Sequence, residues 1–176
     1  MKRQQQIALV LLLLSLLGFG VPKGVHKKVV KEVGKTFEVE GLQLEPIIIS
    51  DPINQKLPTE ITGDNLYKVI DQGNLLGYAF ADQAPSKTAK FDYLVIFDQE
   101  WTVLNSKVLV YREEYGGEIG SKRWLKQFLG KTPNDRVDME TNIDAISGAT
   151  ISVRSMTLAV DNLFQSIAIL RKNELL

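Results

Sequence analysis

Four apolar segments separated by short polar stretches constrain the fold more than any other feature of this sequence. They are NLYKVID (65–71), LLGYAFA (75–81), FDYLVIFD (91–98) and TVLNSKVLVYRE (102–113). The first two are joined at QGN and the last two at DQEW, which begins with Asp98 of the third segment, and both spacings are typical of β-hairpins. The sequence therefore predicts an antiparallel meander of four strands.

Two helices are predicted after these strands. SKRWLKQFLGK (121–131) predicts a short helix that stops at Gly130. Its inward side chains are expected to be Trp124, Leu125, Phe128 and Leu129. A longer helix is expected to begin between Thr150 and Ser152 and to end near Arg171 and Lys172, whose charges suit a helix C-terminus. Its apolar stripe consists of Met156, Ala159, Val160, Leu163, Phe164, Ile167 and Leu170. The predicted fold class is α+β, an antiparallel sheet packed with a short helix and a C-terminal helix.

The first 22 residues are expected to be a signal peptide or a membrane anchor. Lys2 and Arg3 precede an apolar run from Ile7 to about Val21, which is shorter than a typical spanning helix. Several lysines follow the run, and on the positive-inside rule they do not favour export of the rest of the chain.

Residues 23–62 are expected to form a short helix and a connector, with the main domain at 63–176. Four apolar residues recur every fourth position in a lysine-rich context, which predicts an amphipathic helix. They are Val25, Val29, Val33 and Phe37. The proline-containing stretch that follows predicts a connector with one short strand at Ile47 to Ile49.

Composition excludes several classes of function. The 176 residues include no cysteine, which excludes disulfides, thiolate metal sites and iron–sulfur clusters. Twenty-one basic residues balance 21 acidic ones, so nucleic-acid binding is not expected. His26 is the single histidine, and we interpret it as a solvated residue of the lysine-rich helix rather than as part of a hydrolase triad.

A cluster of small residues stands at the expected start of the last helix, in NIDAISGATISVRSM (142–156). A helix N-terminus has unpaired N–H groups and a partial positive charge, and it can bind a phosphate. Gly148 and Ala149 would let backbone approach such a group. The alternative is purely structural and is the commoner case for such spacing: Thr150 or Ser152 is an N-cap and Gly148 makes a turn.

The stretch DAISGAT, Asp144 to Thr150, resembles the flavinylation motif of the FMN-binding domain family. That family includes the flavin-carrying subunits of the Rnf and sodium-pumping NADH:quinone reductase complexes, and the resemblance extends over about 65–169. It implies that the hydroxyl of Thr150 is joined to the phosphate of FMN. It also implies that Asp144, Ser147, Gly148 and Ala149 are recognised by a separate, magnesium-dependent flavin transferase that uses FAD as donor.

The stretch YREEYGGEIGSKRW (111–124) is similar to a glycine-rich loop that approaches the flavin in this family. Glu114 matches the family's glutamate, and the resemblance places Gly117 and Gly120 near the flavin. This sequence departs from the pattern at Tyr115 and Gly116, where threonine and proline are more usual.

Four further side chains are candidates for the same site. Tyr115 and Trp124 are expected either to stack on a flavin or to pack in the core. Lys122 and Arg154 are weaker candidates for contact with the phosphate.

The resemblance implies an exported electron carrier, in the periplasm or on the outer face of the cytoplasmic membrane. The family's transferase works outside the cytoplasm, which favours export over the lysine count. The carrier would pass electrons between a membrane redox partner and an acceptor. Two alternatives remain: a small flavin-dependent reductase with its own substrate, and a non-redox exported binding module of the same fold.

Overall fold

The computed structural model describes residues 23–176 of the chain. The predicted signal peptide or anchor at 1–22 lies outside the described residues. Within 23–176, none of the helices combines the length and the apolar character that crossing a membrane requires.

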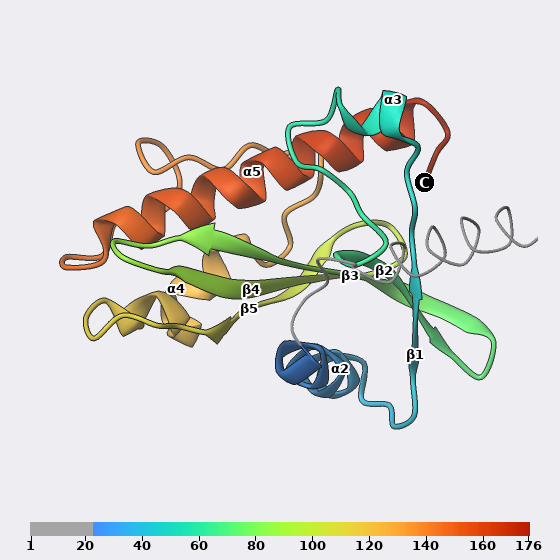
Figure 1. Cartoon of the computed structure of the whole chain (residues 1–176), viewed down its shortest axis with the longest axis horizontal. Helices are drawn as coiled ribbons and strands as arrows, with labels where there is room; N and C mark the ends of the chain where they lie inside the picture. The colour runs from blue at the N-terminus through green and yellow to red at the C-terminus, as the bar shows by residue number, and fades with distance from the viewer. Residues whose placement is uncertain (1–22) are drawn as a thin grey trace, which may run out of the picture.

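The described chain forms a five-stranded antiparallel sheet with the strands in sequence order (Figure 1). The strands are β1 (Gln43–Pro46), β2 (Leu66–Asp71), β3 (Asn74–Pro85), β4 (Lys90–Phe97) and β5 (Val103–Val110). The predicted α+β meander is therefore confirmed, and a fifth strand is added at its edge.

The fifth strand is not where the sequence predicted it. The strand expected at Ile47 to Ile49 is wrong, because the strand that pairs with β2 is β1, at 43–46. The last hydrogen bond of this pairing is donated by the Ile47 N–H to the Leu66 carbonyl oxygen, 2.8 Å away. Ile47 and Ile49 then bury their side chains in the core, while Ile48 is exposed. The chain continues into a short unpredicted helix, α3 (Asp51–Asn54).

Two helices cover opposite faces of the sheet (Figure 1). They are α2 (Lys23–Phe37) and α5 (Thr150–Lys172). Alternate residues of one strand contribute to separate cores, because neighbouring side chains of a strand point to opposite faces. Phe80 belongs to the core beneath α5, whereas Ala79 and Ala81 belong to the smaller core beneath α2. The helix α2 packs on the sheet and β1 is its edge strand, although both precede the predicted boundary near residue 63, which stays a prediction.

The short helix after β5 is divided into turns. The segments are η1 (Gly117–Gly120), α4 (Lys122–Leu125) and η2 (Lys126–Phe128). Trp124, Leu125 and Phe128 are buried, as predicted. The inward orientation expected for Leu129 is wrong, since that side chain is 45% exposed where the helix has already ended.

Candidate functional site

The turn at 144–149 is held in place through its backbone. The indole Nε1 of Trp124 donates to the carbonyl oxygen of Asp144 at 2.7 Å, and the N–H of Asp144 donates to the side-chain oxygen of Gln127 at 2.8 Å. At the other end of the turn, the Ala149 N–H donates to the Ile146 carbonyl at 3.1 Å. Asp144 itself is exposed. Its carboxylate therefore stands in solvent on a fixed backbone.

The turn leads directly into α5, whose first residue is Thr150. Ala149 is the N-cap and has no side-chain cap hydrogen bond, so the first N–H groups of the helix lack the usual side-chain acceptor. Thr150 is exposed, whereas Ser152 is buried with its hydroxyl 3.0 Å from that of Tyr111. Neither Thr150 nor Ser152 is the N-cap, which removes the structural explanation considered for them.

A cavity of about 630 Å³ opens beside Thr150. Three segments line it: the loop between β3 and β4, the chain just after β5, and the end of the 144–149 turn with the start of α5. The lining residues are Lys87, Thr88, Tyr111, Arg112, Glu113, Glu114, Tyr115, Gly148, Ala149, Thr150, Ile151 and Ser152. The cavity combines two cations and two carboxylates with tyrosine rings and the free end of a helix.

Gly116 brings the chain after β5 against the turn. Its φ of +82° is a left-handed conformation that favours glycine. A Cβ at this position would lie 2.9 Å from the Tyr111 hydroxyl oxygen, 3.1 Å from the Ala149 Cβ and 3.2 Å from the Gly148 carbonyl oxygen. Glycine at 116 therefore permits the close contact between these two walls of the cavity.

The loop between β3 and β4 is held by the carboxylate of Glu113. That carboxylate accepts hydrogen bonds from the hydroxyls of Ser86 and Thr88 and from the N–H groups of Thr88 and Ala89, at 2.6 to 3.0 Å. The hydrogen bond from the Ser86 hydroxyl, followed by those from Thr88, lowers the pKa of Glu113 to about 2. Glu113 is thus a structural anion at neutral pH.

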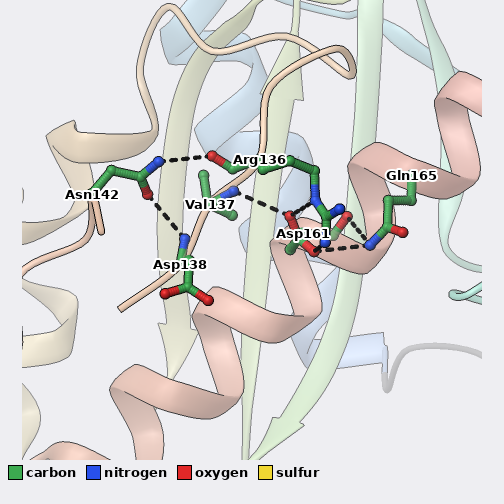
Figure 2. A network of polar contacts seen from close by, with 6 residues as sticks. All are labelled: Arg136, Val137, Asp138, Asn142, Asp161 and Gln165. Atoms are coloured by element: carbon green, nitrogen blue, oxygen red, sulfur yellow. Dashed lines mark hydrogen bonds and ion pairs between the residues drawn. The ribbon is translucent and has the colours of Figure 1, made fainter. Parts of the chain in front are cut away.

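The lead-in to the turn is fastened to α5 by an ion pair (Figure 2). The guanidinium of Arg136 donates two hydrogen bonds to Asp161, at 2.8 and 2.7 Å, and the Val137 N–H donates a third at 3.1 Å. Asn142 closes the same segment, since its amide nitrogen donates to the Arg136 carbonyl and its amide oxygen accepts from the Asp138 N–H. The hydrogen bonds from Arg136 lower the pKa of the Asp161 carboxyl.

Comparison with known proteins places this site in a family. Residues 88–165 match the family described as the FMN-binding domain, a stretch that includes the turn and the start of α5. The chain contains an FMN-binding domain. The crystal structure of Shewanella oneidensis NqrC is similar, with a TM-score of 0.49 and 19% identity over 74% of this chain and 69% of that chain. No curated protein matches the chain.

The FMN-binding domain brings some of the predicted site residues together at the cavity and leaves others outside it. Thr150, Gly148, Ala149 and Glu114 line the cavity. The predicted residues that do not line it are Asp144, Ser147, Gly117 and Gly120.

Of the four further candidates, one lines the cavity and three do not. Tyr115 is 80% exposed and lines the cavity, so its packing in the core is excluded. Trp124 is a core residue, and it supports the turn through its hydrogen bond to the Asp144 carbonyl oxygen. Lys122 and Arg154 do not line the cavity, whose cations are instead Lys87 and Arg112.

The lining residues fit an FMN. The volume lies within the roughly 300–1,000 Å³ of small-molecule sites. The tyrosine rings and Ile151 offer apolar surface to a flavin ring. Lys87 and the uncapped N–H groups of α5 suit a phosphate. Arg112 is already engaged, because its guanidinium lies 2.6 Å from the Asp92 carboxylate.

Proposed function

We propose that this protein is an electron-transfer flavoprotein whose FMN is bound covalently, through its phosphate, to the Thr150 hydroxyl. One observation carries the proposal: Thr150 is the exposed first residue of an uncapped helix and lines the cavity of the FMN-binding domain. A phosphodiester on its hydroxyl would place the remaining negative charge at the positive end of the α5 dipole. Bound FMN supplies the redox chemistry, since a flavin accepts and donates electrons.

Attachment requires a second protein in this proposal. The Thr150 hydroxyl oxygen attacks the phosphorus nearest the flavin in FAD. The new oxygen–phosphorus bond replaces the bond to AMP, AMP leaves with the electron pair, and the hydroxyl proton passes to a base. Glu113 is a poor base near neutral pH because its pKa is about 2, and the single histidine lies on α2, which covers the other face of the sheet from α5. We therefore assign the base and the magnesium ion to a flavin transferase.

The carrier is proposed to work outside the cytoplasm. The apolar run from Ile7 to Val21 and the extracytoplasmic transferase implied by the motif support this location. Electrons would come from a membrane redox partner and pass to an acceptor. A reporter that is active only after export, fused after Leu176, tests the location. A full-length fusion whose reporter stays inactive, while the same reporter is active on a known exported protein, would contradict it.

The covalent bond is tested by co-expression with a flavin transferase in an exporting host, followed by a denaturing gel under ultraviolet light. We expect a fluorescent band for the unchanged chain and none for Thr150→Ala. Thr150→Ser retains a hydroxyl and tests whether a primary alcohol suffices. Thr141→Ala is the matched control, because Thr141 is also exposed and precedes the turn. Fluorescence that survives in Thr150→Ala would overturn the assignment of the linkage.

Asp144 is proposed to act in recognition by the transferase. Its exposed carboxylate does not line the cavity, and a negative charge next to the phosphate would oppose attachment. We expect Asp144→Asn to slow flavinylation strongly while leaving the reduction potential of the recovered holoprotein close to that of the unchanged chain. Normal attachment kinetics with a shifted potential would make Asp144 a tuning residue instead.

A further inference from the structure

A second groove, separate from the FMN cavity, lies between α2, β5 and α4. Its volume is about 610 Å³. The residues that line it are Glu32, Lys35, Thr36, Leu104, Asn105, Ser106, Lys107, Lys122, Leu125, Lys126 and Leu129. Nothing in the proposed flavin chemistry uses this groove.

The groove is strongly cationic. Four of its side chains are lysines and one is acidic. That acid, Glu32, lies 3.7 Å from the Lys35 ammonium and 4.0 Å from that of Lys107, which is too little negative charge to balance the four lysines. Lys122 and Lys126, on the α4 side, are exposed. A net positive charge of about three therefore remains for a partner.

Exposed apolar side chains stand beside these cations. Leu104 is 41% exposed and Leu129 is 45% exposed, and both line the groove. A surface that combines lysines with exposed leucines matches a lipid bilayer, which offers anionic headgroups above an apolar interior.

The position of α2 in the chain supports a membrane as the occupant of the groove. The apolar run of the sequence ends at Val21, two residues before α2 begins. If that run enters a bilayer, α2 starts at the membrane surface, and its Lys35 end belongs to the groove. We propose that the lysine groove docks on a membrane surface rich in anionic phospholipid. This proposal does not depend on the covalent FMN linkage.

Docking on this surface would leave the FMN site accessible. The groove includes residues of α2, whereas Thr150 begins α5, and these helices cover opposite faces of the sheet (Figure 1). A membrane against α2 would therefore leave the Thr150 cavity, at the start of α5, uncovered.

Lysine footprinting tests the proposal on the full chain. The chain is placed in nanodiscs of phosphatidylcholine alone or with one third phosphatidylglycerol, acylated at lysines and analysed by mass spectrometry. We expect Lys107, Lys122 and Lys126 to lose reactivity only on the anionic discs and to regain it in high salt. Lys56, Lys68 and Lys172 are exposed controls outside the groove and should not change. Equal reactivity on both discs, or equal protection on both, would overturn the proposal.

Charge removal provides a second arm. Replacing Lys107, Lys122 and Lys126 by glutamine should lower the preference for anionic over neutral vesicles about 100-fold, because each lysine near the surface contributes about fivefold. The same change at Lys56, Lys68 and Lys172 removes equal charge and should have little effect. Circular dichroism checks that each variant folds. If a variant does not fold, the footprinting of the unchanged chain still tests the proposal. Protection of the groove by inorganic phosphate alone, in detergent, would reassign it to a free anion and overturn membrane docking.

Discussion

Two segments border the cavity beside Thr150, and they are held in different ways. The 144–149 turn is supported by Trp124 and Gln127, which satisfy both backbone polar groups of Asp144. The 86–89 loop is held by one charged group, the Glu113 carboxylate. The turn thus depends on uncharged groups, including the packed ring of Trp124, and exposes the Asp144 side chain, whereas the loop depends on an ionised group. Substitutions at four positions, with matched controls, test this difference.

The largest effect is expected at Trp124, which is 4% exposed and packs edge-on against Phe128 with the ring centres 5.3 Å apart. Trp124→Ala should destabilise the fold by about 3–5 kcal/mol, because it removes a buried aromatic ring. Trp124→Phe retains a ring and loses the hydrogen bond to Asp144, which should cost about 1–3 kcal/mol. Urea unfolding measures both. Equal losses for the two variants would show that the hydrogen bond, rather than packing, holds the turn.

The second effect is expected where the chain after β5 touches the turn. Gly116→Ala should cost about 2–3 kcal/mol, since it adds left-handed backbone strain to a crowded contact with Tyr111 and Ala149. Gly117→Ala is the matched control, because a Cβ at Gly117 meets no atom within 4 Å, and it should cost less than about 0.5 kcal/mol. Thermal unfolding compares the two. An unchanged unfolding temperature for Gly116→Ala would mean that the turn moves aside without a loss of stability.

A smaller effect is expected at Asp161, which anchors the lead-in to the turn. Asp161→Asn should cost about 1.5 kcal/mol, near the low end for charged hydrogen bonds, because the Arg136 side chain is 69% exposed. The folded-state pKa of Asp161 is lowered. Its contribution is therefore complete above the unfolded pKa of about 3.9 and is lost as pH falls through the folded value. The stability difference between the two proteins should shrink below about pH 4. A constant difference would exclude the ion pair as its source.

The sequence predicted the paired strands and the last helix because their apolar periods are local. β1 was misplaced because Gln43–Pro46 lies at the sheet edge with mostly exposed side chains and carries no alternating apolar signal. The isoleucines at 47–49 are better strand formers, yet the chain leaves the sheet there to fill the core. Tertiary packing overrode local propensity at this position.

The sequence predicted the site residues that are neighbours in the chain and missed residues that only the fold brings to the site. The small residues before Thr150 stand next to one another in the sequence, so the motif is visible. Lys87 is missed because it comes from a segment far from the motif, and Tyr111 belongs to the stretch 111–124 that resembles the flavin loop but is not singled out by it. The strand register contains a usable signal: Asp92 pairs with Val110, which places the loop before β4 beside the chain after β5. A meander prediction extended to its register would bring 86–89 next to 111–113.

The smallest effect on the structure is expected from titration of Glu113, and it should be limited to the 86–89 loop. The folded pKa is about 2 and the unfolded value is about 4.3, so the hydrogen bonds of the carboxylate stabilise the loop above about pH 4.3 and are lost toward pH 2. In an NMR titration, the amide signals of Thr88 and Ala89 should follow Glu113, while that of Asp144 should not. Glu113→Gln should abolish these shifts at Thr88 and Ala89, and Glu114→Gln, at an exposed neighbour, should leave them unchanged. If the Asp144 amide also moves with Glu113, the turn and the loop are coupled through the cavity, and the contrast between packing and charge fails.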